Sequence, residues 1–363
     1  MYTEIIKIIE GGLKCEPAKV IQYARKLADK LTEEGNLQLA KGIRNVIDNK
    51  GATTLSMEQL INTAPVDTES RLSIVDIFNP SEVNLEVILP ETVENKVFDF
   101  IKHIENKDKI KSLGFPLQST LLLYGAPGVG KTTIAKYISA QTKLPLVTAR
   151  LDSLISSLLG NTSKNIRRVF EYADSKPCIL FLDEFDAIAK ARDDQHEMGE
   201  LKRVINSLLQ NIDQFSHNNI LIAATNHPEL LDKAIWRRFN SVIEVSQPGA
   251  EGIRKLLTLY ANNYNHDFSS DKRKMDKVIH LLSQKTPSDI RSIVTNAITQ
   301  AIIGNRDKII IDDLLIENFQ FEKHGNFTSD ELIKYLNDNG VPKLQIADLL
   351  NVSIRQIRNN LKD

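Results

Sequence analysis

The first part of the chain carries apolar positions at helical spacing. Over residues 20–31, one face of the expected helix collects the apolar side chains Val20, Ile21, Ala24, Leu27, Ala28 and Leu31. Residues 36–47 repeat this pattern after Gly35. We therefore predict a small helical N-terminal domain over residues 1–50. Residues 51–88 are polar and irregular, with Pro65 and Pro80, and they predict a linker.

The pattern changes after Pro90, where short apolar runs alternate with helical stretches. The runs are STLLLY, LPLVTA, CILFLD, NILIAAT and SVIEV. Uninterrupted apolar strands separated by helices are typical of a parallel sheet that helices cover on both faces. Residues 89–248 are therefore expected to form an α/β domain. From residue 249 onward we predict helices alone, as a helical subdomain over 249–325 and a final helical segment over 326–363.

Composition and charge narrow the class of protein. The 363 residues suffice for about two or three domains. With 42% hydrophobic residues and a net charge of −1, the chain is typical of a soluble globular protein without a bulk attraction for nucleic acid or acidic membranes. The N-terminus lacks a basic leader, and no apolar run is long enough to span a membrane. Cys178 opens an apolar run far from Cys15, so we expect a buried thiol and a cytoplasmic protein.

A glycine-rich loop between a predicted strand and a predicted helix carries the strongest chemical signal. It comprises Gly125, Ala126, Pro127, Gly128, Val129, Gly130, Lys131, Thr132 and Thr133. This G-x-x-x-x-G-K-T pattern lets backbone N–H groups surround a phosphate at the N-terminus of a helix. We expect Lys131 to reach the β- and γ-phosphates of ATP and the Thr132 hydroxyl to bind Mg²⁺.

Two further strand ends carry polar side chains. At the first, Asp183 can hold Mg²⁺ through water, and Glu184 can orient and deprotonate the attacking water. Such a pair is also common where a strand leaves the core, but its place downstream of the phosphate loop favours the Mg²⁺ site. At the second, the Asn226 amide either hydrogen-bonds the γ-phosphate or the lytic water, or forms a turn before Pro228. The residues alone do not decide between these two roles.

The stretch LDKAIWRRF, residues 231–239, places Arg237 and Arg238 side by side. The nearest carboxylate, Asp232, lies too far back along the chain for a helical i,i+4 pair with either arginine. Adjacent guanidinium groups repel each other unless an anion lies near them. The pair therefore predicts either an external anionic ligand or salt bridges to surface acids.

The chain resembles the AAA ATPase family from about residue 88 to residue 302. The resemblance lies in the order and spacing of four motifs: the phosphate loop, LDEFD, AATN and DKAIWRRF. The tandem Arg-Arg-Phe is similar to the spastin and katanin branch of single-ring members. The resemblance implies a five-stranded αβα core of the P-loop NTPase type, a helical lid, and hexameric rings with Mg²⁺ and ATP between subunits. It also implies that Arg237 is an arginine finger acting on the next subunit's ATP, that Arg238 assists it, and that Asn226 is the sensor asparagine.

Departures from the family pattern concern the pore, the lid and proteolysis. Where the family has an aromatic–aliphatic–glycine pore loop that grips substrate, this chain has Leu158, Leu159 and Gly160, which keep apolar contact without an aromatic face. In the lid, TPSDI at 286–290 replaces Ser-Gly-Ala-Asp-Leu, so backbone near Pro287 and Ser288 would border the adenine. The family's zinc protease motif lacks its second histidine here, so no protease activity is expected of this chain.

The two ends suggest partners. Residues 345–362 resemble a helix–turn–helix unit with Ala347 in its first helix, Asn351 at the turn and Ser353 as the cap of the second helix. That second helix is expected to expose Arg355, Gln356, Arg358, Asn359 and Lys362 and to bury Ile354, Ile357 and Leu361. Because bases and acids balance over 326–363, protein docking is favoured over DNA contact. The N-terminal helices loosely resemble adaptor domains that recruit targets.

The sequence thus predicts a homo-oligomeric, Mg²⁺-dependent ATPase, expected to be a hexamer, that remodels or threads a protein substrate. A separately encoded partner such as a peptidase is a sub-hypothesis that rests on the resemblance. The competing hypothesis is an ATPase switch tethered to DNA through residues 345–362. A purely regulatory ring with slow turnover is a third. The identity of the substrate is not encoded in any of these motifs.

Overall fold

The computed structural model describes residues 2–13, 17–33, 36–46, 60–61, 63–67, 73–80, 86–114, 119–151, 159–187, 198–215, 219–269 and 271–361. The chain divides into two compact units. The first comprises residues 1–84, 110–120 and 139–223, and the second comprises residues 85–109, 121–138 and 224–363.

Three helices form the described part of the N-terminal segment: α1 (Tyr2–Leu13), α2 (Pro17–Glu33) and α3 (Leu37–Val46). The middle helix, α2, packs against both of the others. Ala28 and Leu31, two members of the predicted apolar stripe, are buried, as is Ala40 of α3. Lys30 Nζ of α2 donates to Glu4 Oε1 of α1 at 2.8 Å, which adds a polar contact between the two helices.

A six-stranded sheet forms the centre of the predicted α/β domain, in the order β1-β3-β4-β5-β2-β6. Five of its strands are the predicted apolar runs: β2 (Ser119–Tyr124), β3 (Leu146–Arg150), β4 (Ile179–Asp183), β5 (Ile220–Thr225) and β6 (Ser241–Glu244). Strand β4 pairs in parallel with β3 and β5, and β2 pairs in parallel with β6. Nearly every side chain of β2, β4 and β5 is buried, as the uninterrupted apolar runs predicted.

The sixth strand, β1 (Asp76–Phe78), corrects the prediction of a five-stranded sheet. It pairs antiparallel with β3, so that Ile77 lies opposite Val147. Three residues are too short a run for a periodicity test, which is why the sequence did not reveal this strand. The strand belongs to residues 51–88, the predicted linker. Leu60 and Asp67 of the same segment contact α9 (Leu159–Asp174): Asn165 Nδ2 donates to Asp67 Oδ2 at 2.6 Å, and the Tyr172 hydroxyl donates to the Leu60 carbonyl oxygen.

The same part of the chain contains the helices α5 (Glu91–Glu105), α6 (Lys107–Ser112), α7 (Lys131–Thr142), α9 and α11 (Met198–Phe215). In the first unit, α9 and α11 lie side by side, with Phe170 and Phe215 in an edge-to-face contact at 5.5 Å between ring centroids. Cys178 directly precedes β4. Its side chain is buried, with 4% of the residue exposed, which confirms the predicted buried thiol. Burial raises the pKa of Cys178 to about 12.

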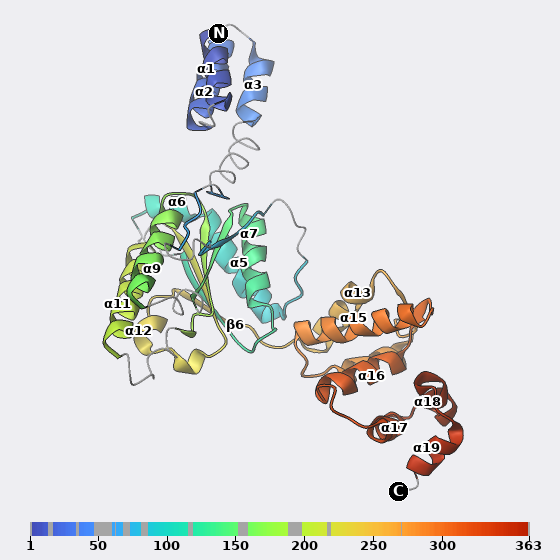
Figure 1. Cartoon of the computed structure of the whole chain (residues 1–363). Coiled ribbons are helices and arrows are strands. Elements are labelled where there is room, and N and C mark those ends of the chain that lie inside the picture. Colours follow the sequence, from blue (N-terminus) through green and yellow to red (C-terminus); the bar gives the residue numbers. More distant parts are fainter. Residues whose placement is uncertain are drawn as a thin grey trace. The chain divides into compact units, whose positions relative to one another are not determined.

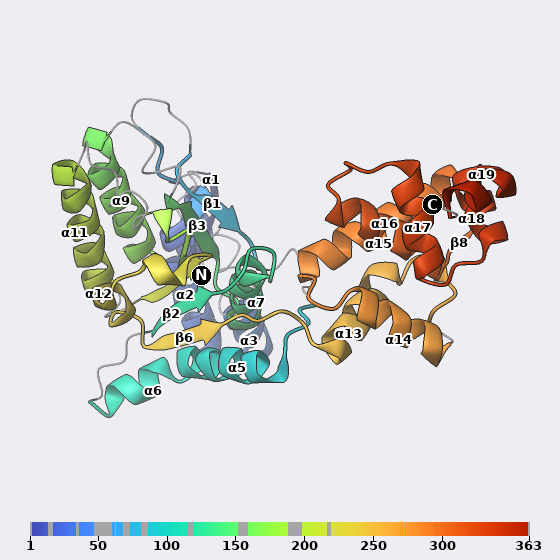
Figure 2. The same ribbon diagram turned by 90° about the horizontal axis from the view of Figure 1, so that it is seen from below.

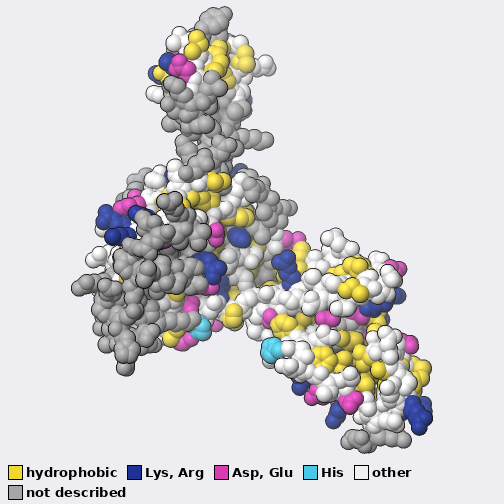
Figure 3. Space-filling model, viewed as in Figure 1, with side chains coloured by type: hydrophobic (Ala, Val, Ile, Leu, Met, Phe, Trp, Pro, Cys, Tyr) yellow, Lys and Arg dark blue, Asp and Glu magenta, His cyan; other side chains and the backbone are white. Residues whose placement is uncertain are grey.

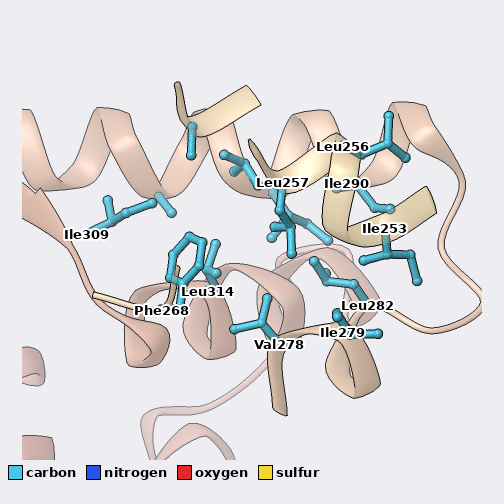
Figure 4. Close-up of a cluster of buried hydrophobic side chains, with 14 of the residues drawn as sticks. Ile253, Leu256, Leu257, Phe268, Val278, Ile279, Leu282, Ile290, Ile309 and Leu314 are labelled. Atoms are coloured by element: carbon cyan, nitrogen blue, oxygen red, sulfur yellow. The ribbon is translucent and has the colours of Figure 1, made fainter. Parts of the chain in front are cut away.

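The helical subdomain after residue 249 consists of α13 (Ala250–Ala261), α14 (Lys272–Leu281), α15 (Pro287–Ile303) and α16 (Ile311–Glu322). These helices enclose a core around Leu257, Phe268, Val278 and Leu314, each fully buried (Figure 4). The prediction that strands cease after residue 249 is wrong in one detail. Two-residue strands β7 (Asn265–His266) and β8 (Lys308–Ile309) pair in parallel at one edge of this core.

The last three helices are α17 (Ser329–Asp338), α18 (Lys343–Leu350) and α19 (Ile354–Asn360). Figure 2 shows α18 and α19 adjacent, joined by Asn351 in the left-handed conformation with φ 54°. Ser353 caps α19 through a reciprocal pair with Gln356, as predicted for a helix–turn–helix unit. Ile346 and Ile357 are fully buried and pack with Leu315 and Phe319 of α16. The last three helices therefore share a core with the helical subdomain after residue 249, which is the predicted lid. Among the described residues, no helix is long and apolar enough to cross a membrane.

Candidate active site

The phosphate loop joins β2 to α7, as the sequence predicted, and its backbone requires glycine. Gly125, Gly128 and Gly130 have φ values of 147°, 80° and 101°, in the region that side chains rarely adopt. A Cβ atom at Gly125 would also lie 2.4 Å from the carbonyl oxygen of Val245. The loop therefore packs closely against the residue that follows β6, with its N–H groups at the start of a 12-residue helix.

Lys131 is the first residue of α7 and is 7% exposed. Its Nζ atom donates to the carbonyl oxygens of Gly125 at 2.8 Å and Ala126 at 2.9 Å. The ammonium group thus lies over the phosphate loop itself, where it can exchange a carbonyl partner for a phosphate oxygen. Thr132 and Thr133 follow in the first turn of α7 and are half-buried.

The lid contacts the phosphate loop at the N-terminus of α15. The Ser288 N–H donates to the Gly128 carbonyl oxygen at 3.3 Å. A Cβ atom at Gly128 would lie 2.7 Å from Thr286 Oγ1, so a glycine is required on both conformational and steric grounds. Thr286 is buried and caps α15 through a reciprocal pair with Asp289. The region around Pro287 and Ser288, predicted to border the nucleotide, therefore touches the loop.

The acidic strand end belongs to the first unit. Asp183 ends β4, and its Oδ1 atom accepts a hydrogen bond from the Glu184 N–H at 3.0 Å. Glu184 has φ 54°, an uncommon left-handed conformation for a residue other than glycine. Such strain at a carboxylate that leaves a buried strand is typical of functional positions, because the surrounding structure must maintain it.

Arg150 is a candidate site residue that sequence reasoning missed. It ends β3, and the parallel register places it opposite Asp183. Its Nη2 atom lies 3.7 Å from Glu184 Oε1 in an ion pair between partly exposed side chains. One signal in the sequence could have drawn attention to it: the predicted strand over residues 144–149 is followed directly by a charged residue.

The asparagine and the two arginines lie in the second unit. Asn226 follows β5 and is half-buried, and the next residue, His227, donates its N–H to Thr225 Oγ1 at 3.0 Å. Arg237 is the C-cap of the one-turn helix α12 (Lys233–Trp236) and is exposed. Arg238 Nη1 donates to the Ala234 carbonyl oxygen at 2.7 Å.

Asp232, the nearest carboxylate in sequence, caps the N-terminus of α12 by accepting from the Ile235 N–H at 3.0 Å. It thus has a structural role at the helix start.

The predicted metal ligands are suited to Mg²⁺ in their chemistry. Thr132 offers a hydroxyl and Asp183 a carboxylate, both half-buried, and oxygen donors are those that Mg²⁺ prefers. Across the described ranges, no group of three or more His, Cys, Asp or Glu could hold a metal ion. Each of the two residues, Thr132 in the second unit and Asp183 in the first, offers an oxygen donor of the kind that binds Mg²⁺ beside phosphate oxygens and water.

The predicted pore loop lies largely outside the described residues. Leu158 is not among them, and Leu159 and Gly160 are the first two residues of α9. Their role in gripping a substrate stays a prediction.

Known proteins share both the sequence and the fold. Residues 121–247 match the family described as "ATPase family associated with various cellular activities (AAA)". An uncharacterized AAA family ATPase, y4kL, from Sinorhizobium fredii is 34% identical over 79% of this chain and 85% of that protein. A proteasome-activating nucleotidase from Methanococcus maripaludis is 31% identical over 70% of this chain, which spans 64% of that protein. The crystal structure of the FIGL-1 AAA domain matches with a TM-score of 0.58 at 21% identity, over 77% of this chain and 94% of that domain.

Proposed function

Since this chain belongs to the AAA family of ATPases, we propose that it forms a homo-oligomeric ring, expected to be a hexamer, that hydrolyses ATP to remodel or thread a protein substrate. The observation that carries the proposal is the phosphate loop in contact with the lid. The loop depends on glycine at Gly125 and Gly128, and Lys131 lies over it. The N-terminus of α15 contacts the same loop. Lid position can therefore respond to what the loop binds.

Each predicted site residue has a role in this proposal. Residues 125–133 bind the phosphates, with Lys131 on the β- and γ-phosphates. Thr132 and Asp183 would hold Mg²⁺, whose positive charge would offset that of the phosphate oxygens. Glu184 accepts the proton of the attacking water, and Asn226 positions that water. The strained backbone of Glu184 and its contact with Arg150 support a fixed orientation of this carboxylate.

Arg237, with the assistance of Arg238, acts on the ATP of the next subunit in this proposal. An arginine supplied in trans neutralises charge as the γ-phosphate leaves, and such residues contribute roughly 10³- to 10⁵-fold to the rate. The exposure of Arg237 at the end of a one-turn helix supports this role, because its guanidinium is available to a second chain.

Remodelling of a protein is the preferred output for two reasons. The similar proteins include one named a proteasome-activating nucleotidase, and the sequence has an apolar segment at Leu158–Gly160 where family members grip polypeptide. We extend this to a protein client and to a separately encoded partner such as a peptidase. A cytoplasmic location agrees with these partners.

The test is a trap experiment in the native cells. Glu184→Gln should bind ATP without hydrolysing it and hold the assembled ring on its client. The variant is recovered with ATP and Mg²⁺, with and without nuclease, beside Lys131→Ala as the control that cannot retain nucleotide. A defined set of proteins that survives nuclease and is absent with Lys131→Ala supports remodelling. Recovery of DNA, with protein partners lost on nuclease treatment, contradicts it.

One observation favours the second candidate, a switch tethered to DNA. In α19, Arg355, Gln356, Arg358 and Asn359 are all exposed, as a recognition helix requires. Lys362 lies outside the described residues. Figure 3 shows basic and acidic side chains interspersed on the C-terminal part, in keeping with the balanced charge that weakens this hypothesis. Leu158→Asp should abolish threading and spare a DNA-tethered switch, whereas Arg355→Ala with Arg358→Ala should do the reverse.

A further inference from the structure

An aromatic contact joins the phosphate loop to the arginine pair. Tyr124 is the last residue of β2 and directly precedes Gly125. Trp236 is the last residue of α12 and directly precedes Arg237. Their ring centroids lie 5.5 Å apart with an interplanar angle of 79°, an edge-to-face arrangement that the charge distribution of aromatic rings favours.

Both rings are held by further contacts on either side of this pair. Trp236 Nε1 donates to the Leu231 carbonyl oxygen at 3.1 Å. The Tyr124 hydroxyl donates to Glu244 Oε2 at 3.4 Å, and the Tyr124 carbonyl accepts from the Val245 N–H at 2.7 Å. Val245 is the residue against which Gly125 packs. A continuous series of contacts therefore connects the start of the phosphate loop to the Trp236 ring.

The arginines depend on such contacts for their orientation. Helix α12 has four residues, and a single helical turn is unstable without tertiary packing. Its contacts include the Asp232 cap, the buried Ile235 side chain and the Trp236 ring. Of these three, the Trp236 ring is the one that touches Tyr124 and lies next to Arg237.

We propose that Trp236 is a positioning residue that couples the phosphate loop of each subunit to the arginine finger which the same subunit offers to its neighbour. The inference rests on the proposed action of Arg237 in trans. Nucleotide phosphates that reorder the loop shift Tyr124, and the edge-to-face contact transmits the shift to α12. Two ATP sites on adjacent subunits are then linked through one subunit, which is an allosteric coupling in the strict sense.

The alternative is that the two rings only fill space in the core. A packing role predicts lower stability and equal losses in every function of the subunit. The coupling role predicts that Trp236→Leu lowers kcat about 10-fold while the KM for ATP changes less than about 2-fold, since only transition-state contacts in the neighbour weaken. Trp236→Phe keeps a ring at this position and should recover most of the activity.

Mixed rings test where Trp236 acts. Full-length Trp236→Leu is combined with Glu184→Gln, whose arginines are intact and whose own site cannot hydrolyse ATP. Arg237→Ala mixed with Glu184→Gln is the positive control for action in trans. Wild type mixed with Glu184→Gln measures how much ATPase activity a ring loses because some of its subunits are inactive. We expect both Trp236→Leu and Arg237→Ala to regain activity on mixing. Recovery with Arg237→Ala and none with Trp236→Leu overturns the proposal and leaves the trans arginine standing, whereas recovery with neither contradicts the trans arginine itself.

A second measurement uses the fluorescence of Trp236, the single tryptophan of the chain. In the Glu184→Gln background, ATP should shift its emission with the midpoint of nucleotide binding. Lys131→Ala should abolish the shift, and Arg237→Ala should retain it, because the cause is the subunit's own loop. Tyr124→Leu should suppress the shift, whereas Tyr124→Phe, which keeps the ring, should not. An unchanged shift in Tyr124→Leu, or no shift in the parent protein, overturns the proposed coupling even if a Trp236 variant fails to fold.

Discussion

Glu184 and Arg150 illustrate how single residues define this site. Glu184 departs from the usual backbone region, and the guanidinium of Arg150 lies 3.7 Å from its carboxylate. Both side chains are partly exposed, so their attraction contributes little to stability. In the proposed mechanism, the contact with Arg150 orients the Glu184 carboxylate, because a general base must point at one water molecule.

Replacing Arg150 should therefore affect turnover more than folding. We expect Arg150→Ala to lower kcat by roughly 3- to 10-fold, in the range of a lost positioning contact, with little change in Tm. The matched control is Arg167→Ala, which removes an exposed ion pair with Glu171 on α9. Steady-state ATPase rates of the two variants decide the matter: equal rates would show that the contact with Glu184 has no role in hydrolysis.

A buried carboxyl in the lid makes stability depend on pH. Glu317 of α16 is 7% exposed, and burial raises its pKa, partly opposed by a hydrogen bond from Asn296. The native state thus holds the Glu317 proton more tightly than the unfolded chain does. Protonated Glu317 therefore contributes stability at pH values below the pKa of this carboxyl in the unfolded chain. That contribution is lost as the pH rises through its pKa in the folded protein. Glu317→Gln should raise Tm at neutral pH and flatten its fall from acid to neutral pH. Thermal unfolding across this range checks the slope, with exposed Glu105→Gln on α5 as the control that should leave it unchanged.

Among the secondary-structure elements, α15 combines a helix cap with a contact to the phosphate loop. Its N-cap Thr286 satisfies the first turn of the helix and also lies against Gly128. Helix α17 has a similar capping box at Thr328, away from the phosphate loop. The two caps allow helix stability and loop contact to be separated.

Thr286→Ala should cost about 1 kcal/mol of stability through the lost cap. It should also weaken ATP binding, because the contact between the lid and the loop loosens. Thr328→Ala should cost a similar amount and leave the ATP dissociation constant unchanged. Calorimetric titration with ATP, beside denaturant unfolding, measures both effects. Similar ATP affinities for the two variants would contradict a role for the cap in nucleotide binding.

How far the sequence predicts the structure also differs among elements. The five apolar strands are predictable because each is an uninterrupted apolar run between helical stretches, and the phosphate loop is predictable because its residues have a fixed spacing. Strands β1, β7 and β8, of three or two residues, are set by tertiary pairing and leave no periodic signal. The contacts of Arg150 with Glu184 and of Tyr124 with Trp236 join residues distant in sequence, so they require the strand order and register.

For the molecule as a whole, the C-terminal helices are part of the lid's structure as well as a candidate docking module. Leu315 and Phe319 of α16 pack with Leu336, Ile346 and Ile357 of α17–α19. Removing residues 326–363 would expose these two side chains of α16.

We therefore expect a chain that ends at residue 325 to unfold at a lower temperature than the full chain. The loss should be several kcal/mol, since uncovering buried Leu and Phe side chains costs about 1.5–3 kcal/mol each. Arg355→Ala with Arg358→Ala, which alters only exposed side chains, should keep the full-length Tm. Differential scanning calorimetry of the three proteins gives the comparison, and an unchanged Tm after truncation would show that the shared core adds no stability.

The short strand β1 has a practical consequence for protein engineering. It covers the side of β3 that would otherwise offer unpaired N–H and C=O groups to another chain. The family match starts at residue 121, so a shortened protein designed on homology alone would omit β1. Strand β3, with Leu146, Val147 and Ala149 buried, is an apolar segment suited to pairing with copies of itself. Expression of the ATPase region should therefore begin before residue 76, because a start beyond β1 would leave the edge of β3 unpaired and prone to aggregation.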